Sequence, residues 1–135
     1  MTEVKKITQV LLVEDDPSVA RLVQFKLEKN GLLVTIKDRG SEAIRWLSDN
    51  RPSLILLDLM LPDISGYQVL EHVKGNPALK DIPVIVLSSR GQKDEIDKCL
   101  ALGAREHILK PFNPTELLDK IISILGEKPG GKVQA

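Results

Sequence analysis

Short apolar runs alternate along this chain with longer stretches in which apolar residues recur at helical spacing. The runs show no alternation of apolar and polar positions, which is typical of parallel strands covered by helices on both faces. The pattern predicts a doubly wound α/β domain with a five-stranded parallel sheet and five helices. The predicted strands are Val10–Val13, Leu32–Ile36, Leu54–Leu57, Pro83–Leu87 and, more weakly, His107–Leu109.

Capping residues and glycines place the ends of the five predicted helices. Asp16 and Pro17 open the first, Ser41 caps the second, and either Asn113 or Thr115 opens the fifth. The third is expected from about Ser65 to Lys74 and the fourth from about Lys93 to Leu102. We therefore expect one domain over residues 1–126, followed by a flexible tail or linker stump at 127–135.

Composition narrows the classes of function. The chain has 135 residues, 42% of them hydrophobic, which suits one domain with a substantial core. Lys plus Arg and Asp plus Glu are both 19, and aromatic residues are few, so direct nucleic-acid binding is not expected. No apolar stretch is long enough for a membrane span and no secretory signal is evident, so we predict a cytoplasmic protein. The single cysteine, Cys99, is expected to be a buried structural residue.

Polar residues close four of the apolar runs: Glu14-Asp15-Asp16, Asp58, Ser88 and Lys110. The carboxyl ends of the strands in an open parallel sheet border one crevice, so these side chains should converge there. Crowded carboxylates repel one another unless a hard divalent cation with oxygen ligands lies among them. The sequence therefore predicts a Mg²⁺ site.

The segments LLVEDD, LILLDLMLPDISG, PVIVLSS and KPF occur in that order along the chain. With this order and spacing, the chain resembles the receiver domain of two-component response regulators from about Ile7 to Leu125. The resemblance implies the flavodoxin-like strand order 2-1-3-4-5. It also implies a magnesium-dependent phosphoacceptor switch that catalyses only its own phosphorylation and dephosphorylation, and is not otherwise an enzyme.

The resemblance assigns a role to each strand-end residue. Asp58 becomes the phosphoacceptor, a carboxylate nucleophile. Ser88, in preference to Ser89, and Lys110 would neutralise the charge of the phosphoryl oxygens. The implied Mg²⁺ ligands are Glu14, Asp15, Asp58 and the backbone carbonyl of Met60, whereas Asp16 is expected to be a helix cap. Lys110 before Pro111 resembles the site of a cis peptide bond in the family.

Two departures from the family pattern bear on signalling. His107 lies where receivers usually carry Tyr or Phe as a rotamer switch with the hydroxyl residue, so a switch role for His107 with Ser88 stays open. Arg105-Glu106 and Lys120 depart from the charge pattern through which the transcription-factor branch dimerises. The expected partners are a histidine kinase or histidine phosphotransfer protein and an unknown downstream protein, with no membrane; we expect a monomer or weak dimer.

Other functions remain as alternatives. A flavin-binding electron carrier is disfavoured because Glu14-Asp15-Asp16 would repel a phosphate. A phosphatase of the haloacid dehalogenase type needs an acid where Met60 stands. A phosphorylation-independent interaction module is disfavoured by the complete set of Asp58, Ser88 and Lys110. A receiver within a longer protein and a single-domain regulator are both compatible with the sequence.

Overall fold

Five parallel strands form the centre of the molecule in the order β2-β1-β3-β4-β5. The structure, a computed structural model, describes residues 8–126. The strand order confirms the flavodoxin-like topology that the resemblance implied. The strands are β1 (Gln9–Val13), β2 (Leu33–Lys37), β3 (Leu54–Asp58), β4 (Val84–Ser88) and β5 (Glu106–Leu109).

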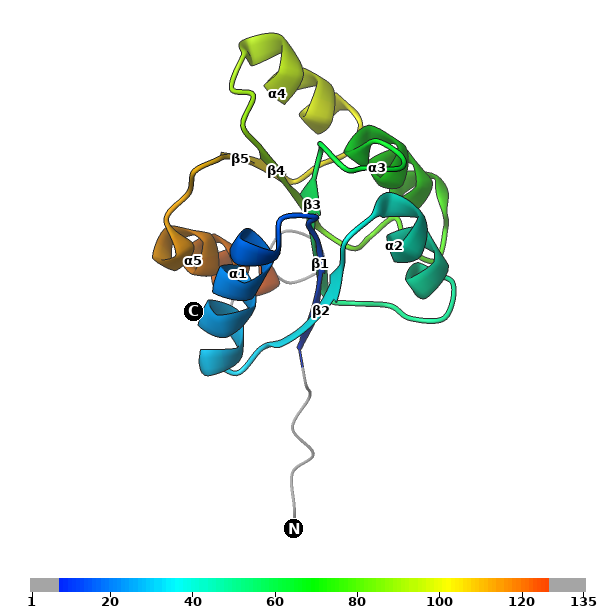
Figure 1. Cartoon of the computed structure of the whole chain (residues 1–135). Helices are drawn as coiled ribbons and strands as arrows, with labels where there is room; N and C mark the ends of the chain where they lie inside the picture. Colours follow the sequence, from blue (N-terminus) through cyan, green and yellow to red (C-terminus); the bar gives the residue numbers. More distant parts are fainter. Residues whose placement is uncertain (1–7, 127–135) are drawn as a thin grey trace.

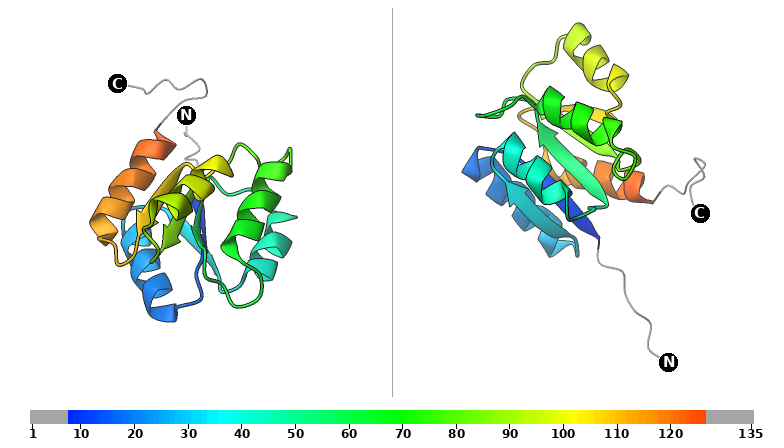
Figure 2. Two further views of the ribbon diagram at one scale, coloured as in Figure 1. Left: turned by 90° about the horizontal axis from the view of Figure 1, so that it is seen from above. Right: turned by 90° about the vertical axis from the view of Figure 1, so that its right-hand side faces the viewer.

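Helices cover both faces of this sheet, as Figures 1 and 2 show. One face carries α1 (Pro17–Lys29) and α5 (Pro114–Leu125). The other carries α2 (Gly40–Leu47), α3 (Gly66–Gly75) and α4 (Lys93–Ala101). Alternate strand residues point to the two sides, so that Leu11 and Val13 lie in one apolar core and Val10 and Leu12 in the other. All residues of β3 and β4 are buried, which explains their uninterrupted apolar sequences.

Three helices begin at caps that follow local sequence rules. Asp16 accepts hydrogen bonds from the N–H groups of Ser18 and Val19, which confirms the interpretation of this acid as a helix cap. Ser65 and Gln68 form a capping box at α3. At α5 the cap is Asn113 and not Thr115, because the Asn113 side chain accepts a hydrogen bond from the Thr115 N–H at the helix start.

The prediction for the start of α2 was wrong. The helix begins at Gly40, with Arg39 at the N-cap position, so Ser41 lies inside the first turn. The N–H groups of Gly40 and Ser41 donate instead to the carboxylate of Asp63, from the loop between β3 and α3. A rule that considers only neighbouring residues cannot find such a cap.

Two further sequence predictions concern burial and the membrane. Cys99 is fully buried, as expected. Within residues 8–126, no helix combines the length and apolar character needed to cross a membrane. The predicted tail at 127–135 lies outside the described residues, so the domain boundary at residue 126 stays a prediction.

Candidate functional site

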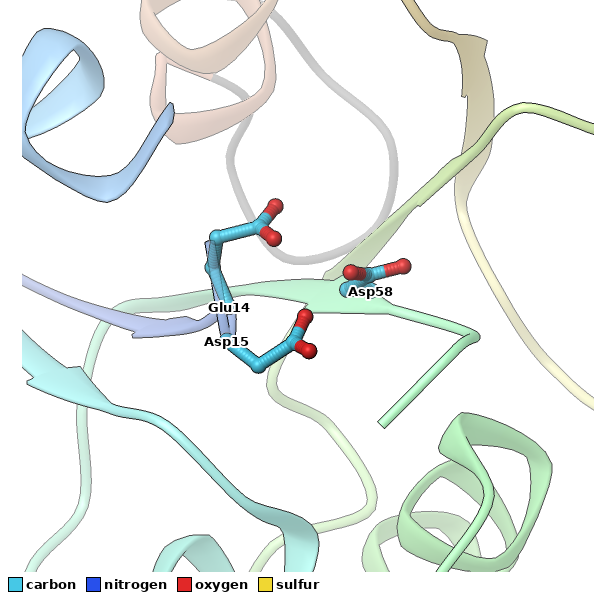
Figure 3. A group of neighbouring side chains, drawn as sticks. All are labelled: Glu14, Asp15 and Asp58. Carbon is cyan, nitrogen blue, oxygen red and sulfur yellow. The ribbon is translucent and has the colours of Figure 1, made fainter. Parts of the chain in front are cut away.

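Three carboxylates meet at the carboxyl edge of the sheet. Glu14 and Asp15 follow β1, and Asp58 ends β3, the strand paired with β1. One oxygen from each of these side chains lies within 4.8 Å of the others (Figure 3). Glu14 and Asp58 are buried, with 1% and 3% exposure, whereas Asp15 is exposed. The side chains converge because neighbouring parallel strands end at the same edge.

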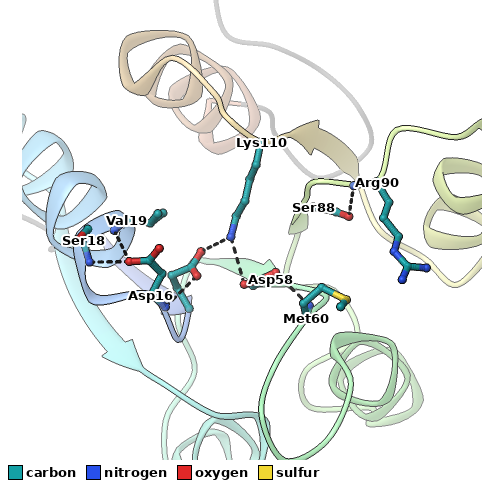
Figure 4. A network of polar contacts seen from close by, with 9 residues as sticks. Asp16, Ser18, Val19, Asp58, Met60, Ser88, Arg90 and Lys110 are labelled. Atoms are coloured by element: carbon teal, nitrogen blue, oxygen red, sulfur yellow. Dashed lines mark hydrogen bonds and ion pairs between the residues drawn. The ribbon is translucent and has the colours of Figure 1, made fainter.

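Lys110 brings a positive charge to the two buried acids. Its Nζ donates to Glu14 Oε1 at 2.8 Å. It also donates to Asp58 Oδ2 at 3.1 Å (Figure 4). The Lys110 backbone N–H donates to the Ser88 carbonyl, and this bond holds the residue that follows β5 against the end of β4. The Lys110–Pro111 peptide bond is cis, in agreement with the resemblance.

The ionisation of the cluster reflects burial and mutual contact. Burial raises the pKa of Glu14, and the nearby Asp58 carboxylate adds to this, although the hydrogen bond from Lys110 acts in the opposite direction. Burial alone would lower the pKa of Lys110, but its contacts with Glu14 and Asp58 outweigh burial and raise it. Lys110 therefore stays charged at neutral pH. With the acids ionised, three carboxylates face one ammonium group, a surplus of negative charge.

The loop after β3 holds the carboxylate and backbone of Asp58. The Met60 N–H donates to Asp58 Oδ1 at 3.0 Å, and the Gly66 N–H donates to the Leu59 carbonyl at 3.0 Å. A Cβ at Gly66 would lie 2.4 Å from the Asp58 carbonyl oxygen, so a side chain there would displace the backbone of Asp58. This close approach accounts for the glycine at the start of α3.

Ser88 supplies a buried hydroxyl at the end of β4, the strand that pairs with the Asp58 strand β3. Its side chain is fully buried at the end of β4, whereas Ser89 is exposed. The Ser88 Oγ accepts a hydrogen bond from the Arg90 N–H at 2.9 Å (Figure 4). A hydroxyl can accept and donate at the same time, so this accepted bond leaves the Ser88 O–H able to donate to a ligand oxygen.

Two other predicted residues contribute no side chain to this group of contacts, although the Asp16 backbone N–H donates to Glu14 Oε2 at 3.1 Å. Asp16 is committed to capping α1, as described above. His107 lies in β5, paired with Val86 of β4. Among the described residues, its buried Nε2 has no hydrogen-bond partner. The switch role of His107 with Ser88 therefore stays a prediction.

Comparison with known proteins identifies the family. A family model described as the response regulator receiver domain matches residues 10–122. The chain belongs to the response regulator receiver family. Receiver domains of this family act as phosphoacceptor switches in two-component signalling.

Relatives of this receiver domain include longer regulators. The phosphate regulon transcriptional regulatory protein PhoB of Escherichia coli (strain K12) is 38% identical over 117 residues, covering 87% of this chain and 51% of that protein. PhoB of Pseudomonas aeruginosa is 32% identical over 126 residues, covering 93% of this chain and 55% of that protein. The chain therefore spans about half the length of the curated relatives it matches.

Solved structures share the fold. A putative response regulator from Chloroflexus aurantiacus J-10-fl superposes with a TM-score of 0.84 at 31% identity, covering 89% of this chain and 98% of that chain. The phosphorylated cyanobacterial phytochrome response regulator RcpA gives a TM-score of 0.77 at 34% identity, covering 88% of this chain and 91% of that chain. The α/β architecture of this receiver domain is thus the one found in solved receivers.

The acidic cluster of the receiver domain fits a hard divalent cation. Its donors are carboxylate oxygens, two of them on buried residues, and the surplus negative charge is of the sign that a cation neutralises. A cation would also remove the repulsion that Asp58 exerts on Glu14. The donor set therefore favours Mg²⁺ or a similar ion over a softer metal.

The sequence predictions missed two polar contacts near the site. Asp63 caps α2 from the β3–α3 loop, and Arg39, which cannot accept a hydrogen bond, was the available signal that α2 lacks a local cap. The Tyr67 hydroxyl of α3 donates to Glu95 Oε1 of α4 at 2.6 Å. No sequence rule pairs these two residues, because they lie on separate helices.

Proposed function

We propose that this receiver domain takes a phosphoryl group on Asp58 from a histidine kinase or histidine phosphotransfer protein, in a Mg²⁺-dependent reaction, and that a partner protein then recognises the phosphorylated form. The observation that carries the proposal is the buried Asp58 carboxylate, held between the Lys110 ammonium and the Met60 N–H and beside two further acids. A structural carboxylate would not require this convergence of charge at a strand end.

In the proposed reaction, an Asp58 carboxylate oxygen attacks the phosphorus of a phosphohistidine. A P–O bond forms and the P–N bond breaks; the imidazole leaves with the electron pair and takes a proton from water. The protein mainly has to align the nucleophile and neutralise the transferring oxygens. Lys110 Nζ, already 3.1 Å from Asp58 Oδ2, supplies positive charge, and Ser88 Oγ supplies a hydroxyl donor.

The residues that would hold Mg²⁺ are Glu14, Asp15, Asp58 and the backbone carbonyl of Met60. The ion would offset negative charge on the acids and on the phosphoryl oxygens. Because few protein ligands contribute and Mg²⁺ retains several waters, we expect weak binding, on the order of the sub-millimolar to millimolar range. The carboxylates of Glu14 and Asp58, which Lys110 contacts, would then interact with both Lys110 and the ion.

The output is proposed to be a phosphorylation-dependent contact with an unidentified downstream protein. Direct nucleic-acid binding by this domain is not proposed, because acidic and basic residues balance along the chain. Glu106 of β5 and Lys120 of α5 pair within the chain at 3.4 Å, which agrees with the proposed monomer or weak dimer. The switch role of His107 remains a prediction. The cytoplasmic location also remains a prediction.

Intact-mass spectrometry tests the proposed function. Incubation with Mg²⁺ and a small phosphodonor such as acetyl phosphate should add one phosphoryl group to the wild type. Asp58→Asn keeps the size and one hydrogen-bonding oxygen but removes the nucleophile, so it should remain unmodified, as should wild type treated with a metal chelator. An unmodified wild type would refute the proposed function and favour a phosphorylation-independent interaction module. Equal labelling of the Asn variant would show that a residue other than Asp58 is the phosphoacceptor.

A further inference from the structure

The N-terminus of α2 is capped from the loop that carries the residues after Asp58. The Gly40 N–H donates to Asp63 Oδ1 at 2.9 Å, and the Ser41 N–H donates to Asp63 Oδ2 at 3.0 Å. The first N–H groups of a helix have no partner within the helix, and within the described chain the Arg39 side chain makes no capping bond. Asp63 thus satisfies two backbone donors of an element distant in sequence.

The same carboxylate shapes its own loop. Asp63 Oδ1 also accepts from the Ile64 N–H at 2.8 Å. The Ile64 side chain lies against the backbone of α2, since a Cβ at Gly40 would be 2.5 Å from Ile64 Cγ1. Hydrogen bonds and packing therefore fix residues 63 and 64 to the start of α2. The hydrogen bonds, foremost that of the Ser41 side chain, hold the pKa of Asp63 below its ordinary value, so the carboxylate is charged at neutral pH.

Residues 59–65 are consequently held at both ends. On the side of β3, the Met60 N–H binds Asp58 Oδ1, and the Gly66 N–H closes the loop onto the Leu59 carbonyl. On the far side, the contacts of Asp63 and Ile64 with α2 are the anchor. Met60 lies between these anchors with an exposed side chain, so its backbone position depends on both.

We propose that Asp63 is a positioning residue. By holding residues 59–65 against the N-terminus of α2, it sets the position of the Met60 backbone beside Asp58, and with it the affinity of the site for Mg²⁺ and the rate of phosphorylation. The inference rests on the proposed function, in which the Met60 carbonyl is a metal ligand. It predicts that the site depends on a side chain that need not contact the ion or the phosphoryl group.

A pair of variants separates this role from simple stabilisation of α2. Asp63→Ala removes the helix cap and the hydrogen bonds that tie the loop to α2, and it leaves the packing of Ile64 in place. Adding Arg39→Ser to Asp63→Ala places a hydroxyl at the N-cap, where the backbone is extended (φ −152°, ψ 157°) as capping residues require. The double variant should regain the thermal stability that Asp63→Ala loses, but its loop still lacks the hydrogen bonds to α2.

Titration with Mg²⁺ followed by NMR gives the deciding measurement. We expect about ten-fold weaker Mg²⁺ binding in both variants, the lower end of what the loss of an outer-shell hydrogen bond costs a metal site. In the wild type, Mg²⁺ should also shift the amide signals of Gly40 and Ser41, because Asp63 links them to the loop. In Asp63→Ala these two shifts should disappear.

Wild-type Mg²⁺ affinity in Asp63→Ala, or its recovery in the double variant, would overturn the proposal and leave Asp63 as a helix cap alone. The phosphorylation rate with acetyl phosphate should fall in parallel with affinity and approach the wild-type rate at saturating Mg²⁺. A wild type that binds Mg²⁺ but takes no phosphoryl group would refute the proposed function, whereas the comparison of Mg²⁺ affinities would still decide the role of Asp63.

Discussion

The hydrogen bond between Tyr67 and Glu95 should hold α4 against the domain. Of the residues of α4, all of which the structure describes, Cys99 is the buried one. The Tyr67 hydroxyl donates to Glu95 Oε1 at 2.6 Å, and Lys98 Nζ lies 4.1 Å from the centre of the Tyr67 ring. Tyr67→Phe removes the hydroxyl and keeps a ring beneath Lys98, so it isolates the hydrogen bond.

The size of the effect follows from the type of bond. A hydrogen bond to a charged group contributes about 1.5–3 kcal/mol, and the partial exposure of Glu95 and Tyr67 reduces this to about 1 kcal/mol. Loss of about 1 kcal/mol should increase the population in which α4 is lifted by about five-fold. Local opening of this kind exposes groups that are buried in the closed form.

Cys99 can report the opening without an engineered cysteine. It is the single cysteine of the chain and has 0% exposure, and burial raises the pKa of its thiol, so the closed form should react slowly with a thiol reagent. With reagent concentrations at which labelling tracks the open population, Tyr67→Phe should be modified about five-fold faster than wild type. Glu95→Gln, which retains an acceptor oxygen, should fall between them.

Global unfolding must be measured alongside, because it also exposes Cys99. The free energy of unfolding, from denaturant titration, should greatly exceed the free energy of the opening that labelling reports. Equal labelling rates in wild type and Tyr67→Phe would show that this bond does not hold α4. A rate increase fully accounted for by global destabilisation would equally refute a local role.

Three further predictions concern the site and its support. Asp15→Ala should weaken Mg²⁺ binding more than Asp16→Ala in an NMR titration, because Asp16 is engaged at the start of α1; the opposite ranking would mean that the acidic pair is misassigned. Gly66→Ala should lower the free energy of unfolding by about 1–3 kcal/mol, because its Cβ would lie 2.4 Å from a backbone oxygen. A Cβ at Gly75 would meet none of the described atoms within 4 Å, so Gly75→Ala should raise the free energy of unfolding by about 0.4–1 kcal/mol. Similar chemical denaturation curves for Gly66→Ala and Gly75→Ala would contradict the packing argument. Met60→Asn should speed loss of the phosphoryl group about five-fold, which is roughly 1 kcal/mol of barrier, because an amide can hydrogen-bond the attacking water and the exposed Met60 side chain cannot. Mass spectrometry of the purified phosphoprotein over time measures the lifetime, and an unchanged lifetime would show that residue 60 does not control access of water.

The sequence predicted the sheet and the convergence of the acids because both depend on local patterns. Apolar runs locate the strands, and a parallel sheet aligns their carboxyl ends, so Glu14 and Asp58 had to lie near one another. The strand order came from the resemblance to receivers. The sequence also placed Lys110 at this edge, but its pairing with both acids depends on how the segment after β5 crosses the edge of the sheet, which no local pattern describes.

The wrong prediction at Ser41 and the missed contact of Tyr67 have one physical cause. Both involve exposed or partly exposed polar groups whose partners are chosen by the packing of separate elements. Apolar periodicity identifies which side of a helix is buried, but it does not rank the polar residues that meet at the margins of the core. A helix start without a local acceptor, as at Arg39, is nevertheless a signal to search distant loops for an acid.

The burial of Glu14 and Asp58 links the stability of the domain to its proposed chemistry. Two buried acids beside each other destabilise the folded state unless positive charge lies close to them, and Lys110 provides only one such charge. The cation and the phosphoryl group would bring opposite charges to the same place. Binding both would therefore change the net charge of the site less than binding the cation alone. The surplus negative charge of the site would therefore fall when the cation binds and return in part when the phosphoryl group is added. The anchors of the β3–α3 loop then matter because they keep Met60 and Asp58 in place while that balance changes.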